Sequence, residues 1–111
     1  MEDCLFCKIL NGDIPCDRVY EDDMVLAFND INPAAPVHVL IIPKVHFDNF
    51  VSADDEYISA IKKAVVIITE KLGIDKKGYR LVFNTGDDGG QTVHHLHCHI
   101  LGGRFMEWPP G

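Results

Sequence analysis

Residues 92–103 read TVHHLHCHILGG and hold four of the six histidines in this 111-residue chain. Histidines alternate with apolar residues here, and a period of two predicts a β-strand whose faces have different surroundings. We place this strand at residues 96–101. One face carries His95, His97 and His99, and the core face carries Leu96, Cys98 and Ile100. His94 then points away from the row of three histidines.

A row of imidazoles can serve as a metal site, as a catalytic array or as a solvated surface. Imidazole is a common metal ligand, but the strand rise spaces alternate side chains about 7 Å apart, so three rings diverge from a single ion. A neutral imidazole can also act as a nucleophile, and its unperturbed pKa of about 6.5 keeps it largely neutral at cytoplasmic pH. The spacing therefore favours catalysis over a cage of three histidines.

The remaining pattern predicts an α+β domain. We expect strands at residues 19–21, 24–28, 37–42 and 79–84, a short helix at 4–10 and a long helix at 53–72. Because short loops join consecutive strands, they should form an antiparallel sheet of about five strands. No repeat or linker interrupts the sequence, so residues 1–111 are expected to form a single domain.

Each predicted helix has an apolar face directed toward the core. In the short helix this face consists of Leu5, Phe6, Ile9 and Leu10, and in the long helix of Tyr57, Ile58, Ile61, Val65, Ile68 and Leu72. Ser52 and Asp55 resemble a capping box, and Gly73 is placed to end the long helix.

The composition narrows the range of functions. The formal net charge is -7, which argues against nucleic-acid polymers as partners, since their binding depends on basic patches. A single nucleotide remains compatible with this charge, because backbone amides and a few side chains can hold one phosphate group. The sequence shows no signal peptide and no apolar run of membrane-spanning length, so we expect a cytoplasmic protein without membrane partners.

Cys4 and Cys7 form a C-x-x-C pair near the N-terminus. In a cytoplasmic chain, cysteines are more often thiols or metal ligands than disulfides. A redox pair is disfavoured because no βαβ unit surrounds the motif. The two cysteines could also be small buried residues with only a packing role. Half of a zinc site is the preferred interpretation, and His38 or His46 with one member of the histidine cluster could complete it.

A glycine-rich loop at residues 84–92 precedes the histidine strand. Such a loop is usually only a turn, but Gly89 and Gly90 allow backbone N–H groups to approach an anion closely. Asp87 and Asp88 should point away from any phosphate held there. Together with the nearby imidazoles, the loop indicates a phosphate-binding site.

Several separated motifs resemble one known family. The segment HLHCHIL at residues 95–101 is similar to the motif of the histidine triad (HIT) superfamily. The stretches AFNDINPAAPVHVLIIPKVH (27–46) and LGGRFMEWPPG (101–111) resemble its HINT-type branch, the histidine triad nucleotide-binding proteins. The resemblance extends from about Cys4 to Gly111. It implies a dimerising HIT-like fold in one HIT domain and a homodimeric hydrolase that cleaves P–N bonds in nucleoside 5′-phosphoramidates and aminoacyl-adenylate-like compounds.

The resemblance also implies roles for individual residues. His97 becomes the nucleophile that attacks the α-phosphorus and forms a nucleotidyl-histidine, His99 contacts the phosphate, and His38 and His95 support protonation and orientation. A purine nucleotide such as an AMP or GMP derivative is the implied ligand. The implied nucleotide-binding residues are Leu5, Phe6, Ile9, Phe28, Asp30, Ile31, Asn84, Gly90, Gln91, Thr92, His97, His99 and Trp108.

Relatives with the C-x-x-C pair hold zinc, and by that pattern the ligands are Cys4, Cys7, His46 and His95. Four protein ligands make a closed, structural zinc site, and no organic cofactor is expected. In this case His95 coordinates zinc instead of moving protons. The alternatives are hydrolysis of dinucleoside polyphosphates and a non-catalytic module that binds nucleotides or a partner. His99 and the WPPG tail disfavour the first alternative, and the intact row of histidines disfavours the second.

Overall fold

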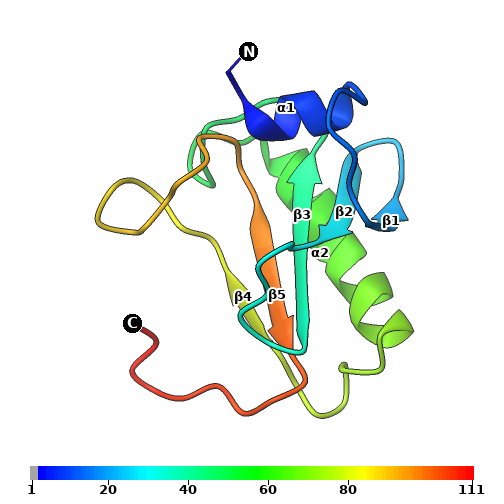
Figure 1. Ribbon diagram of the computed structural model, residues 1–111, viewed down its shortest axis with the longest axis vertical. Helices are drawn as coiled ribbons and strands as arrows, with labels where there is room; N and C mark the ends of the chain where they lie inside the picture. Colours follow the sequence, from blue (N-terminus) through cyan, green and yellow to red (C-terminus); the bar gives the residue numbers. More distant parts are fainter. Residues whose placement is uncertain (1–2) are drawn as a thin grey trace.

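The computed structural model describes residues 3–111 and contains a five-stranded antiparallel sheet with strand order β1-β2-β3-β5-β4 (Figure 1). The elements are α1 (Leu5–Leu10), β1 (Arg18–Glu21), β2 (Val25–Asn29), β3 (Val37–Pro43), α2 (Asp55–Lys71), β4 (Arg80–Val82) and β5 (Cys98–Gly102). The predicted α+β class, the strand count and the two helices are confirmed. Within residues 3–111, no helix is long and apolar enough to cross a membrane.

The central strands bury both faces, which explains their continuous apolar sequences. Alternate residues of β2 and β3, such as Ala27 and Ile41, pack with α2 in one core cluster. The intervening residues, such as Phe28 and Leu40, pack with Phe6 of α1 in a second cluster. Figure 1 shows α2 behind the sheet and α1 crossing near the end of β3. The sheet therefore separates an α2 layer from an α1 layer.

α2 buries one face and is ended by Gly73, whose φ is +71°, as its sequence predicts, but its N-terminal cap differs from the prediction. The capping box is wrong: Asp54 is the N-cap, and it makes no side-chain capping bond. Ser52 instead donates its hydroxyl to the Asn49 carbonyl and closes a turn before the helix. The sequence predicts Leu72 on the buried face, but its side chain is 36% exposed, because Leu72 is the C-cap, where the chain leaves the helix.

α1 is short and is fixed at its beginning by a cysteine. Cys4 is the N-cap, and its sulfur accepts a hydrogen bond from the Cys7 N–H. Phe6 and Ile9 are buried as predicted, whereas Leu5 is 43% exposed instead of facing the core. With six residues, the helix can direct only a narrow stripe toward the sheet, and Leu5 lies beside that stripe.

β5 confirms the alternation of faces but begins two residues later than predicted. Leu96 donates its N–H to the Phe47 carbonyl and so leaves the sheet ladder. Within the strand, Cys98 and Ile100 are buried in the α2 layer, as expected. His94 precedes the strand and is exposed, so strand alternation does not set its direction and this part of the prediction is wrong. β4 is likewise shorter than the predicted strand at 79–84.

Candidate active site and metal centre

Cys4, Cys7, His46 and His95 bring one ligand atom each to a common point, with all four atoms within 4.8 Å of one another. The His95 Nδ1 lies 3.3 Å from the Cys4 sulfur and 3.5 Å from the Cys7 sulfur. The His46 Nδ1 lies 3.4 Å from the Cys7 sulfur. Tetrahedral zinc with ordinary bond lengths requires S···N separations of about 3.6 Å. The four predicted ligands thus form a cluster whose size and donor set fit zinc.

The far nitrogens of both histidines are occupied, which fixes their tautomers. His95 donates its Nε2–H to the Pro43 carbonyl at 3.1 Å, and His46 donates its Nε2–H to the Asp48 carboxylate at 3.1 Å. Both Nδ1 lone pairs are therefore directed at the sulfurs, as is typical of metal-ligating histidines with a second hydrogen bond. Burial lowers the pKa of His95 to about 4, so this ring stays neutral, the form that binds a metal.

His97 is oriented by the residue two positions before it. Its Nδ1–H donates to the His95 carbonyl at 2.8 Å, so the lone pair of its Nε2 is free. The ring of Phe6 packs edge-on against His97, with 5.1 Å between centroids. Burial lowers the pKa of His97, which keeps the ring neutral. The metal cluster and the predicted nucleophile are thus joined through the His95 main chain and through α1.

His99 receives its tautomer from His38. The Ala34 N–H donates to the His38 Nδ1 at 3.0 Å, so the proton of the neutral His38 ring is on Nε2. That proton points to the His99 Nδ1 at 2.9 Å. The neutral His99 ring must then carry its own proton on Nε2, which is buried and has no partner within residues 3–111. His99 is therefore prepared to donate a hydrogen bond.

Burial is the main cause of the low pKa values in this group. It lowers the pKa of His99 to about 4, and the neighbouring His97 and His38 lower it further. Burial also lowers the pKa of His38, while the carboxylate of Asp30 acts in the opposite direction. All these rings are neutral at pH 7. A neutral imidazole offers one lone pair and one N–H. The bond from His97 to the His95 carbonyl leaves the lone pair of His97 on Nε2, and the bond from His38 leaves the proton of His99 on Nε2.

His97 and His99 line a cavity of about 370 Å³. This volume is within the range of small-molecule sites, which is about 300–1,000 Å³. Nine of the predicted nucleotide-binding residues line the cavity, namely Leu5, Phe6, Ile9, Phe28, Asp30, Ile31, Thr92, His97 and His99. The lining also includes Ile14, Cys16, Leu40 and Val93, which the sequence did not single out. An apolar half contributed by α1, β2 and β3 thus adjoins a polar end with imidazoles and a carboxylate.

Four predicted nucleotide-binding residues lie elsewhere. Asn84, Gly90 and Gln91 belong to the loop that precedes Thr92 in the chain, and they do not line the cavity. Gln91 is buried, with its amide bonded to the main chain. Trp108 lies in the C-terminal tail, is 80% exposed and is near Arg80. Figure 1 shows this tail leading away from the sheet.

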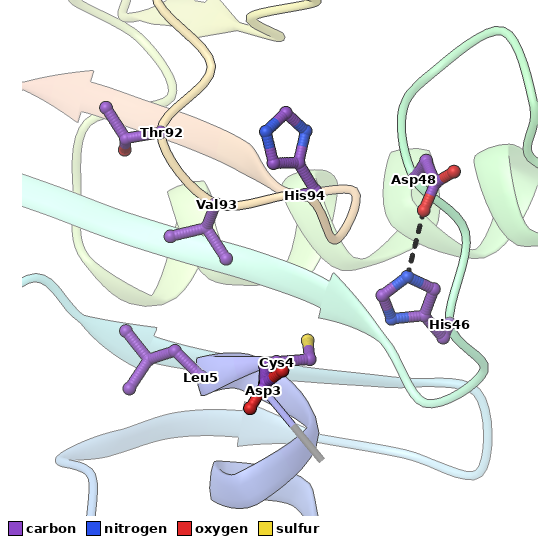
Figure 2. A pocket seen from close by; sticks show the side chains of 8 residues that line it. All are labelled: Asp3, Cys4, Leu5, His46, Asp48, Thr92, Val93 and His94. Atoms are coloured by element: carbon purple, nitrogen blue, oxygen red, sulfur yellow. Dashed lines mark hydrogen bonds and ion pairs between the residues drawn. The ribbon is translucent and has the colours of Figure 1, made fainter. Parts of the chain in front are cut away.

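A second hollow continues from the cavity toward the metal cluster. It shares Leu5, Thr92 and Val93 with the cavity. Figure 2 shows these three side chains on one side of the hollow and His46, bonded to Asp48, on the other. The exposed His94 also lines this hollow, contrary to the direction expected from strand alternation. Two residues of the metal cluster, Cys4 and His46, line this hollow.

Residues 11–106 match the family model of the HIT domain. The chain belongs to the HIT family. This match confirms the resemblance that the histidine row indicated, and it covers every strand of the sheet.

The chain is similar to proteins named for zinc binding, for hydrolysis and for nucleotide binding. The chain is 43% identical to the 14 kDa zinc-binding protein of Brassica juncea, over 98% of this chain and 100% of that protein. A HIT family hydrolase from Clostridium thermocellum superposes with a TM-score of 0.93 at 50% identity, covering 96% of each chain. A histidine triad nucleotide-binding protein from Candida albicans superposes with a TM-score of 0.86 at 35% identity, covering 96% of this chain and 83% of that chain.

Proposed function

We propose that this HIT protein is a nucleotidyl hydrolase that cleaves the P–N bond of purine nucleoside 5′-phosphoramidates and releases a nucleoside monophosphate. The observation that carries the proposal is the pairing of two neutral imidazoles in one cavity. His97 offers a free Nε2 lone pair, and His99 offers an unpartnered Nε2–H. One ring can therefore attack phosphorus while the other holds a phosphoryl oxygen. The names of the hydrolase and nucleotide-binding relatives support this choice.

The two halves of the cavity match the two halves of a nucleotide. The purine lies in the apolar half, against Phe6 and Phe28. Asp30 accepts hydrogen bonds from the ribose hydroxyls with its carboxylate, and the α-phosphate lies between His97 and His99. Asn84, Gly90 and Trp108 remain proposed contacts to the phosphate and leaving-group side, although this chain alone does not place them in the cavity.

In the first step, the Nε2 of His97 forms a bond to the α-phosphorus while the bond from phosphorus to the amine nitrogen breaks. The amine departs with a proton taken from solvent at the cavity mouth. The His99 Nε2–H stabilises the negative charge that develops on the phosphoryl oxygen. Because His97 keeps its Nδ1–H, the nucleotidyl-imidazole carries a positive charge. The His95 carbonyl and the Asp30 carboxylate favour that charge, since both raise the pKa of His97 against the effect of burial.

In the second step, a water molecule attacks the same phosphorus and the bond to His97 Nε2 breaks. One proton of the water goes to solvent, and the imidazole returns to its neutral form. The net reaction consumes one water and yields the free amine and a nucleoside 5′-monophosphate. No side chain other than His97 changes its covalent partners.

We further propose that Cys4, Cys7, His46 and His95 bind a structural zinc ion. When bound, zinc supplies a crosslink between α1 and the segments around His46 and His95, with no open position for substrate. His95 then acts as a ligand and supports His97 only through its main-chain carbonyl. The fit of the donor set and the zinc-binding name of the Brassica juncea relative support this assignment.

We also propose a homodimer formed through β4 and the adjoining face of α2. β4 is an edge strand of the sheet, and it pairs only with β5 within residues 3–111. Four exposed apolar side chains gather around it, namely Phe50, Val66, Tyr79 and Leu81. Sedimentation equilibrium of the wild type should give a dimer, and Leu81→Glu should shift it toward the monomer. A monomeric wild type at micromolar concentration contradicts this assignment. The proposed compartment remains the cytoplasm.

The enzymatic proposal is tested by supplying an adenosine 5′-phosphoramidate and a diadenosine polyphosphate to the purified protein in parallel. We expect AMP and free amine from the first substrate at a much higher kcat/KM than any product from the second. The opposite preference favours a dinucleoside polyphosphate hydrolase. Binding of AMP without turnover of either substrate favours a non-catalytic module.

A further inference from the structure

We infer that Gln91 is a positioning residue that holds the Thr92–Val93 wall of the nucleotide cavity against the segment carrying the metal ligand His46. This inference rests on the proposed nucleotide-binding function of the cavity. It replaces the expectation that Gln91 contacts the phosphate, because the side chain is buried behind the wall.

The amide of Gln91 is fully used within the protein. The residue is only 6% exposed, and it does not line the cavity. Its Oε1 accepts the Gly86 N–H at 3.1 Å, and its Nε2 donates to the carbonyls of Asp48 at 2.5 Å and Val93 at 3.1 Å. The oxygen faces an N–H and the nitrogen faces two carbonyls, so the orientation of the amide is determined. Neither N–H of the amide remains available for a phosphate oxygen.

These bonds connect the segment that contains the cavity wall, residues 91–96, with residues 47–48, which follow the metal ligand His46. The Asp48 carboxylate accepts the Nε2–H of the metal ligand His46, and the neighbouring Phe47 carbonyl accepts the Leu96 N–H at 2.7 Å. Residues 91–96 are therefore attached to residues 47–48 at both ends. Within residues 3–111, Gln91 provides the only side-chain hydrogen bond between the loop at 85–93 and this segment. Its loss should free one end of the wall.

The wall borders the cavity and the adjoining hollow. Val93 packs against the apolar cluster that contains Phe6 and Ile9, where the nucleoside is proposed to bind. Thr92 lines the cavity and also the adjoining hollow. A residue that only positions this wall should affect binding of the nucleoside and of the nucleotide alike. A residue that contacts phosphate should affect the nucleotide alone.

The test compares adenosine and AMP binding by calorimetry, well below the melting temperature of each variant. In Gln91→Met, both affinities should fall by a similar factor of about ten, the effect of losing one or two buried hydrogen bonds. Gln91→Glu keeps the acceptor for Gly86 but lacks the donors, so it should show the same pattern if Gln91→Met does not fold. His99→Ala is the comparison for a phosphate contact and should weaken AMP selectively. Weakening of AMP alone in the Gln91 variants, or no change, overturns the inference.

Amide hydrogen exchange of the ligand-free protein is a second measurement, and it does not depend on the proposed function. In either Gln91 variant, the N–H groups of residues 91–93 should exchange at least about ten times faster, whereas those of α2 should not change. Unchanged exchange in the wall overturns the inference. A wild type that binds neither adenosine nor AMP refutes the proposed function of the cavity, and the exchange rates still decide whether Gln91 holds the wall.

Discussion

Replacing Phe6 with alanine should destabilise the protein and impair the proposed active site together. Phe6 is only 4% exposed, and its ring centroid lies 5.1 Å from that of His97, 5.8 Å from Phe28 and 5.9 Å from His95. Truncation of a buried phenylalanine costs about 3–5 kcal/mol. We expect the lower end of this range, because the ring borders a cavity and its loss enlarges that cavity instead of creating a dry void.

The expected change in melting temperature follows from the chain length. The unfolding entropy of a domain of this size is about 0.23 kcal/mol/K, so a loss of about 3 kcal/mol lowers Tm by about 13 °C. Without the ring against it, His97 loses one of the contacts that orient it, and small misplacement of a catalytic group costs about ten- to a hundredfold in rate. Calorimetry and the turnover of adenosine 5′-phosphoramidate measure these two effects.

Ile68→Ala is the matched control. Ile68 is fully buried in α2, on the other side of the sheet, and it does not line the cavity. Its truncation should lower Tm to a similar extent, since loss of a buried isoleucine costs about 2–5 kcal/mol. Turnover well below both melting temperatures should be retained in Ile68→Ala. A Tm change under about 4 °C in Phe6→Ala, or an equal loss of turnover in both variants, refutes the reasoning.

Three further predictions concern the metal, the pH and the loop. Cys7→Ser should abolish the zinc content measured by mass spectrometry of metals, whereas Cys16→Ser should retain it, and a zinc-free wild type contradicts the site. The folded-state pKa of His99 is lowered to about 4, so its neutral form contributes stability above pH 6.5 that is lost as pH falls from about 6.5 to about 4. Denaturant unfolding should show a shallower pH dependence in this window for His99→Gln, and an unchanged slope disagrees with this cause. In Gly89→Ala, the added Cβ lies 2.3 Å from the Thr85 carbonyl oxygen, so melting should reveal a loss of about 1–3 kcal/mol; unaltered stability counts against this steric argument.

The fold could be predicted largely because its signals are local and periodic. The alternation around His97 indicates a strand with two different faces, and Cys98 and Ile100 are buried in the core as expected, in the cluster that contains α2. The continuous apolar stretch at 37–42 indicates a strand buried on both faces, which β3 is. The two helices follow from their apolar spacing.

Two of the errors depend on contacts between segments distant in the sequence, and a third, at Ser52, depends on a local turn. The strand begins at Cys98 because Leu96 bonds to Phe47, and no local pattern specifies this partner. Leu5 is exposed because the short α1 is oriented by Phe6 and by the cysteines that it brings to the cluster. Ser52 does not cap α2, because its hydroxyl donates to the Asn49 carbonyl and closes the turn before the helix.

The sequence predicts most residues of the site, but it does not predict the hydrogen bonds that orient them. The sequence and the family resemblance indicate the cysteine and histidine set that the structure brings within 4.8 Å. They do not indicate that Ala34 and His38 set the tautomer of His99, because that depends on backbone groups. The sequence also does not indicate the burial of Gln91, because one of its bonds is to the carbonyl of Asp48, 43 residues away.

In the proposed reaction, His97 carries the nucleotidyl group during turnover. Acid quenching of the enzyme during reaction with adenosine 5′-phosphoramidate, followed by peptide mass spectrometry, should find an adenylyl adduct on His97. His97→Ala should show neither the adduct nor turnover, while retaining AMP binding. An adduct on another residue, or full turnover by His97→Ala, contradicts the account.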